Sequence, residues 1–209
     1  MCFDSIGAIY RTSSGEYDVG PIAGFGGPFK TATEYYEAWA KSAKSNIGIK
    51  PEKNQPFPAR LQTIARRISN YNLGPFSVVH VDFGNYNILV DDEYNIRSII
   101  DWDCAAVLPI EFAAVYPADL HTLPEIYWIG SPMDNDQRRE EERDEKVIRE
   151  RYIEFIEAEE EKRGFKKRLS HELEGMNAFI ALSIKLYEDG SQNPLCRIID
   201  LFEDTHGAD

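Results

Sequence analysis

The stretch SVVHVDFGNYNILVDDEYNIRSIIDW, residues 77–102, decides the fold prediction, and the rest of the chain is placed around it. It begins with the β-branched pair Val78 and Val79, which is typical of a buried strand. A second apolar run covers residues 88–90, breaks at the acidic sequence DDEYN and resumes over residues 96–100. Two apolar runs separated by a short polar loop predict a β-hairpin.

Polar side chains mark the ends of these apolar runs. His80 and Asp82 follow the first run, Asn87 directly precedes the second, and Asp101 follows the third. Because a hairpin returns the chain to its starting end, Asp82, Asn87 and Asp101 are expected at the same end of the ribbon.

Metal-assisted phosphoryl transfer is the chemistry that uses such a set of side chains. Magnesium prefers hard oxygen ligands and keeps several waters, so the carboxylate of Asp101 and the amide oxygen of Asn87 suffice as protein ligands. Asp82 is then free to accept a proton from an attacking hydroxyl. Taken singly, each residue has a structural alternative, because Asp and Asn are also favoured in turns and at helix caps. The ordered set between two strand-length apolar runs favours the functional interpretation.

The sequence HVDFGNYNILVD followed by IIDWD resembles the catalytic core of the aminoglycoside phosphotransferase and choline kinase-like family, particularly its fungal members. The family pattern is HxDxxxxN, then an aliphatic strand and an acidic turn, then IDW or IDF. The resemblance implies ATP as co-substrate, Asp82 as the base, and Asn87 and Asp101 as magnesium ligands. It also implies that His80 is a structural support of the loop, not a catalyst.

The resemblance implies a fold that is mainly α with a small β-hairpin (α+β), similar to the C-terminal lobe of a protein kinase. A single domain is expected over residues 1–209, with the catalytic segment at 77–103 and a helical C-terminal part at 136–205. The expectation is a C-terminal lobe only, because no strand lysine or phosphate-binding loop is recognised before residue 80. The glycine-rich GPIAGFGGPF, residues 20–29, does not have the GxGxxG spacing.

Helices are predicted on both sides of the catalytic segment. Thr31 and Glu34 form a capping-box pattern that starts one helix, and a second helix is expected over residues 59–72. Residues 136–163 are rich in charge but carry apolar residues at helical spacing, which predicts a long amphipathic helix with one solvated face. The apolar residues of this long helix are Val147, Ile148, Tyr152, Phe155 and Ile156. Further helices are expected from Ser170 and from Asn193-Pro194.

The composition restricts the partners and the compartment. The 209 residues carry a formal net charge of -13, which disfavours nucleic acid and anionic membranes and is compatible with a cationic substrate. Cys2, Cys104 and Cys196 are far apart and form no CxxC pair, so we expect reduced, mostly buried thiols. With neither a signal-peptide pattern nor a membrane-spanning run, the expected location is the cytoplasm.

Two functional hypotheses follow. The first is an ATP- and Mg-dependent phosphotransferase acting on a small-molecule hydroxyl acceptor, with aminoglycosides, choline-like alcohols, sugars and fungal metabolites all open. The alternative is a non-catalytic, truncated kinase-like lobe that acts as a binding or interaction module. In either case a homodimer or a partner chain is expected to cover the surface where an N-terminal lobe would dock.

Overall fold

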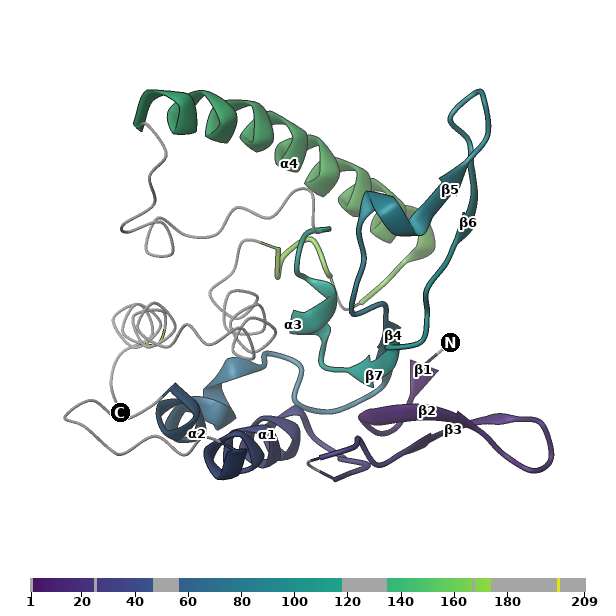
Figure 1. Cartoon of the computed structure of the whole chain (residues 1–209), viewed down its shortest axis with the longest axis vertical. Helices are drawn as coiled ribbons and strands as arrows, with labels where there is room; N and C mark the ends of the chain where they lie inside the picture. The colour runs from purple at the N-terminus through teal and green to yellow at the C-terminus, as the bar shows by residue number, and fades with distance from the viewer. Residues whose placement is uncertain are drawn as a thin grey trace.

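The computed structural model describes residues 2–24, 26–46, 57–117, 135–166, 168–173 and 199. Within these ranges it contains helices and antiparallel sheets, so an α+β fold is confirmed (Figure 1). In chain order the named elements are β1 (Cys2–Phe3), β2 (Gly7–Arg11), β3 (Tyr17–Gly20), α1 (Ala32–Asn46), α2 (Phe57–Ile68), β4 (Phe76–Val79), the 3-10 helix η1 (Asn85–Asn87), β5 (Ile88–Val90), β6 (Ile96–Ile99), β7 (Ala106–Leu108), α3 (Ile110–Ala113) and α4 (Asn135–Arg163).

The described part of the chain contains a five-stranded antiparallel sheet in the order β1-β4-β7-β2-β3. The sequence predicted the small hairpin and the strand at Val78 and Val79, which is part of β4, so the strand content is larger than expected. The strands are short, and β1, β4 and β7 come from distant parts of the chain. Their pairing is set by tertiary contacts, which no local pattern of alternation reveals.

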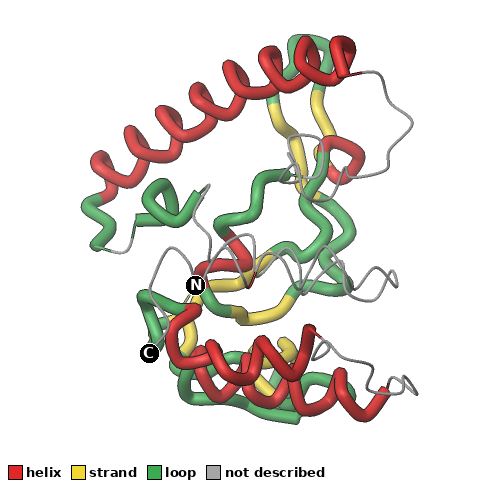
Figure 2. The backbone as a smooth tube through the Cα atoms, turned by 90° about the vertical axis from the view of Figure 1, so that its left-hand side faces the viewer, coloured by secondary structure: helices red, strands yellow, loops and turns green. Residues whose placement is uncertain are grey.

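The helices α1 and α2 pack together and supply most of the apolar core (Figure 2). The predicted capping box is confirmed: Thr31 Oγ1 accepts a hydrogen bond from Glu34 N (3.1 Å), and Glu34 Oε2 accepts one from Thr31 N (3.2 Å). The second helix ends at Ile68, earlier than predicted, and Asn72 lies outside it. Its Oδ1 accepts a hydrogen bond from Thr33 N, in the first turn of α1 (2.9 Å).

An aromatic cluster joins α1 to α3. Tyr35 meets Phe29 and Phe112 edge to face, with ring centroids 6.0 and 5.5 Å apart, and Tyr36 stacks on Phe112 at 6.2 Å. Such aromatic pairs stabilise the fold beyond the contribution of apolar burial. Because α3 follows β7 and also contacts β4, this cluster packs α1 against the part of the sheet formed by β4 and β7.

The long helix α4 is confirmed and lies at the opposite end of the molecule from α1 and α2 (Figures 1 and 2). Its expected apolar stripe is only partly buried, because Val147, Ile148 and Phe155 are 50%, 50% and 74% exposed. Glu160 is buried instead. Its carboxylate accepts hydrogen bonds from the hydroxyl (2.6 Å) and backbone N–H of Ser170, which satisfies its oxygens.

Several predictions lie outside the described residues. They include most of the helix predicted after Ser170 and the helix predicted from Asn193-Pro194. Among the described helices, none combines the length and the apolar character needed to span a bilayer.

Candidate active site

The register of the sheet brings the two halves of the predicted catalytic segment to one edge. Val79, the last residue of β4, pairs with Ala106, the first residue of β7. Because the strands are antiparallel, the chain that leaves β4 toward His80 lies beside the chain that enters β7 from Asp101. The hairpin of β5 and β6 connects these two segments.

Ile100 ties this edge together through its backbone. Its N–H donates to Asn87 O (2.9 Å), and its carbonyl lies 2.8 Å from His80 Nε2. A carbonyl oxygen only accepts hydrogen bonds, so Nε2 carries the proton and donates. Asp101 is the next residue in the chain, and its backbone is therefore fixed beside both ends of the loop formed by residues 80–87.

His80 lies at the start of this loop and is packed by aromatic rings. Its imidazole lies 4.7 Å from the ring of Trp102 and 5.9 Å from that of Phe83, measured between centroids. The indole N–H of Trp102 donates to Ile99 O (2.8 Å). These contacts hold His80 toward the hairpin backbone.

Asn87 is the buried member of the set, with 5% of its surface exposed. Its Nδ2 donates to Asp82 O (2.8 Å), and its backbone N–H donates to Gly84 O (3.1 Å). The side chain therefore closes the loop on Asp82. Since Nδ2 is already committed, Oδ1 is the atom of this amide that suits a hard cation.

Asp82 is exposed, and Oδ1 of its carboxylate accepts a hydrogen bond from the hydroxyl of Tyr86 (2.7 Å). Sequence reasoning missed Tyr86, because a tyrosine four residues after an aspartate in a polar turn carries no distinctive pattern. Gly84 makes room for its ring: a Cβ at Gly84 would lie 2.5 Å from Tyr86 Cε1. The contact between Tyr86 and Asp82 therefore depends on the glycine between them.

Asp101 has a left-handed backbone, with φ 62°. This conformation costs a residue with a Cβ on the order of 1 kcal/mol, although Asp tolerates it better than most. Strained residues that the surroundings hold in place gather at functional sites. The turn that follows Asp101 is exposed and contains Cys104. The thiol of Cys104 is free and exposed, so the expectation that it is buried was wrong.

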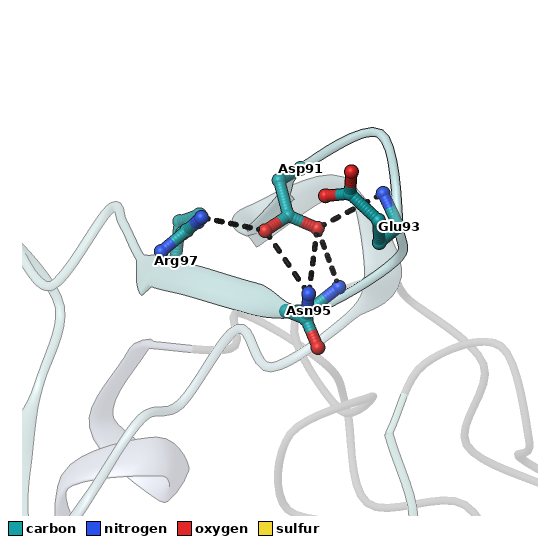
Figure 3. Close-up of polar contacts among 4 residues, drawn as sticks. All are labelled: Asp91, Glu93, Asn95 and Arg97. Carbon is teal, nitrogen blue, oxygen red and sulfur yellow. Dashed lines mark hydrogen bonds and ion pairs between the residues drawn. The ribbon is translucent and has the colours of Figure 1, made fainter.

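The carboxylate of Asp91 holds the tip of the hairpin (Figure 3). Its Oδ1 accepts hydrogen bonds from Glu93 N (3.1 Å) and Asn95 N (2.8 Å), and its Oδ2 lies 2.7 Å from Arg97 Nη2. The backbone N–H of Asn95 is the main cause that lowers the pKa of Asp91 below its ordinary value. Behind this turn the hairpin pairs Val90 with Ile96 and, after a register shift between Leu89 and Val90, Ile88 with Ile99.

Asn87 and Asp101 offer the hard oxygen atoms that magnesium prefers. In the described ranges no three His, Cys, Asp or Glu side chains gather into a metal cage. Magnesium that arrives with a nucleotide needs fewer protein ligands, because phosphate oxygens and water complete its shell. The hard oxygens of Asn87 and Asp101 fit that requirement.

Residues 17–115 match the model of the phosphotransferase enzyme family, a range that holds the loop, the hairpin and β7. Neither the search of curated proteins nor the search of solved structures returned a match. The family match supports the phosphotransferase family indicated by the sequence and, in general terms, ATP-dependent phosphotransfer.

Proposed function

We propose that this chain transfers the γ-phosphoryl group of ATP to a hydroxyl of a small molecule. Asp82 acts as the base, and Asn87 and Asp101 hold magnesium. The observation that carries the proposal is the double contact of Ile100, whose N–H binds Asn87 O and whose carbonyl binds His80. This contact keeps Asp101 next to the loop that carries Asp82.

The reaction follows from the character of each group. The acceptor hydroxyl attacks the γ-phosphorus, its proton passes to the carboxylate of Asp82, and the bond between the γ-phosphorus and the bridging oxygen breaks. ADP leaves with that electron pair. Bound magnesium would neutralise the charge of the phosphate chain. The protein's own part is to orient the acceptor and receive the proton.

A cationic acceptor fits the surroundings best. The chain has a net charge of -13, and the exposed rings of Tyr86 and Trp102 belong to the residues next to Asn87 and Asp101 in the sequence. Aromatic faces and carboxylates both attract cations.

A non-catalytic binding module is the second candidate, and one contact favours it. Oδ1 of Asp82 is already engaged by the hydroxyl of Tyr86. A carboxylate held by its own loop resembles a structural residue as much as a base. The two candidates differ in whether Mg·ATP binds and turns over.

The deciding experiment is calorimetric titration of the full chain with ATP, with and without magnesium. Asp101→Asn is the informative variant, because Asn also tolerates a left-handed backbone and only the charge is lost. Asp92→Asn, in the exposed hairpin turn, is the matched control. We expect binding that requires magnesium, weakens at least tenfold in Asp101→Asn and is unchanged in the control.

Two results would contradict the proposal. Equal binding by the wild type and Asp101→Asn would remove Asp101 from the metal site. Absence of binding in all three proteins, each shown to be folded by circular dichroism, would leave the binding-module hypothesis.

A further inference from the structure

Glu111 is a buried carboxyl group that the proposed reaction does not use. It lies in α3, with 0% of its surface exposed. Burying a carboxylate away from water is costly unless other groups satisfy its charge and its oxygens. The groups around Glu111 therefore decide which protonation state the fold accepts.

The surroundings of Glu111 come from three segments besides its own helix. From α1, the hydroxyl of Tyr36 donates to Oε2 (3.2 Å). From the chain after α2, the hydroxyl of Ser69 is hydrogen-bonded to the carboxyl, and from residues 168–173, Glu172 contributes a second negative charge. Glu172 is itself held by Asn70 Nδ2 (3.2 Å).

This environment favours the neutral acid. Among the described residues, Oε1 of Glu111 has no hydrogen-bond partner. Burial is the largest cause that raises the pKa of Glu111, and the charge of Glu172 adds to it. The hydroxyl of Ser69, the backbone N–H and the hydroxyl of Tyr36 oppose the rise. The pKa reaches about 7, against an ordinary value of 4.5.

The position of Glu111 gives this titration a structural consequence. Ser69 lies in the chain that connects α2 to β4, and α3 follows β7 directly. The groups that meet at Glu111 are therefore connected through the chain to β4, which precedes Asp82, to β7, which follows Asp101, and to α1. Ionisation would place a second charge beside Glu172 at the point where these elements meet.

We propose that Glu111 is a positioning residue, a protonation-sensitive clasp that holds α3 and the strand after Asp101 against α1 and the chain entering β4. The neutral acid closes the clasp, and the carboxylate loosens it. This inference does not depend on the proposed phosphotransfer, because it concerns the fold's response to pH.

The first test is urea unfolding of the wild type and Glu111→Gln between about pH 5 and about pH 8. A folded-state pKa above the unfolded value stabilises the fold at low pH, and this contribution is lost as the pH rises through the folded-state pKa. A change from 4.5 to about 7 predicts that the wild type loses a factor on the order of 50 to 100 in its folded-to-unfolded ratio relative to Glu111→Gln. Glu161→Gln, on the exposed side of α4, should behave as the wild type and controls for the general charge effect.

Two further variants predict effects of opposite sign, which keeps the test decisive if Glu111→Gln does not fold. Glu172→Gln removes a charge that raises the pKa of Glu111, so the loss of stability with pH should shrink. Tyr36→Phe removes a hydrogen bond that lowers this pKa, so the loss should grow. A purely structural role for these side chains would not produce opposite pH dependences.

A spectroscopic signal tests the positioning role directly. The backbone amide of Val107 lies in β7, so its NMR signal reports on the strand that follows Asp101. We expect it to shift with pH in the wild type, with a midpoint near that of Glu111, and to stay constant in Glu111→Gln.

Two outcomes would overturn the proposal. One is an identical pH dependence of stability in the wild type and Glu111→Gln. The other is a stability loss that potassium or calcium ions abolish, with tetramethylammonium as the reference salt, since the buried oxygens would then bind a cation in place of the proton.

Discussion

The packed core and the candidate active site are held together by different interactions. In the core, α1 and α2 bury side chains such as Tyr36, Leu61 and Ile68 almost completely. In the segment 80–102, large apolar side chains such as Ile96 and Trp102 remain exposed. There the geometry comes from hydrogen bonds to Ile100, Asp82 and Asp91.

This difference separates stability from site geometry. Apolar burial is non-directional and contributes free energy roughly in proportion to area, so the core sets how stable the chain is. Hydrogen bonds contribute less net free energy but fix direction, so the site depends on a few donors and acceptors. Substitutions in the two regions should therefore have distinguishable consequences.

The largest effect should follow from Leu61→Ala in the core. Leu61 is fully buried, and removing its side chain loses both the transfer free energy and the packing of a filled site, about 2–5 kcal/mol. Leu73→Ala is the matched control, because Leu73 is 67% exposed and should cost about 0.5 kcal/mol or less. Urea unfolding followed by circular dichroism measures both. Similar losses for the two leucines would contradict the division between core and surface.

Asn87→Ala should have the next largest effect and should act on both stability and the site. It removes the part-buried hydrogen bond from Asn87 Nδ2 to Asp82 O, which costs about 0.5–1.5 kcal/mol. The matched control is Asn85→Ala, an exposed asparagine in the same 3-10 helix. Unfolding and Mg·ATP titration are measured together. If Asn87→Ala binds Mg·ATP like the wild type, Asn87 is a structural residue only.

Tyr86→Phe should change stability little but alter the chemistry. The exposed hydroxyl contributes about 0.5–1.5 kcal/mol at most, yet its removal frees Oδ1 of Asp82 for another hydroxyl. We expect the slow hydrolysis of Mg·ATP, with water as acceptor, to rise several-fold.

Gly84→Ala tests the same contact by another route. The added Cβ would collide with the ring of Tyr86, so the ring must move. The same several-fold rise in Mg·ATP hydrolysis is therefore expected. Tyr94→Phe, on an 85% exposed side chain at the hairpin tip, is the control. If the hydrolysis of Mg·ATP fell in both Tyr86→Phe and Gly84→Ala, then Tyr86 would orient Asp82 and not block it.

Local patterns predicted the parts of the molecule that local interactions form. The hairpin with its DDEYN loop and the capping box of Thr31 and Glu34 depend on residues a few positions apart, and both are present. The five-stranded sheet was missed because strands as short as β1 and β7 depend on partners far along the chain. The exposure of Phe155 and the burial of Glu160 were also missed, since spacing alone does not show which face of a helix finds partners.

The candidate site divides in the same way. Asp82, Asn87 and Asp101 were predicted from their order along the chain, and their roles stay predictions until binding is measured. Tyr86 and Glu111 were not predicted, because each depends on a specific neighbour in space. Tyr86 meets Asp82 within a folded loop, and Glu111 meets Tyr36 across 75 residues of sequence.

The smallest expected effect is a local response of the hairpin tip to acid. The pKa of Asp91 lies below its ordinary value of 3.8, chiefly because the backbone N–H of Asn95 donates to the carboxylate. A lowered pKa means that this contribution is present above the unfolded-state pKa and is lost as the pH falls through the folded-state value. The amide signals of Glu93 and Asn95 in NMR spectra should therefore shift below about pH 4, while the core signals of α1 and α2 stay unchanged. Asp91→Asn should show the acid form of these signals at neutral pH, and Asp92→Asn should not. If the core signals moved together with the tip, the hairpin and the core would form one cooperative unit, and the separation of stability from site geometry would fail.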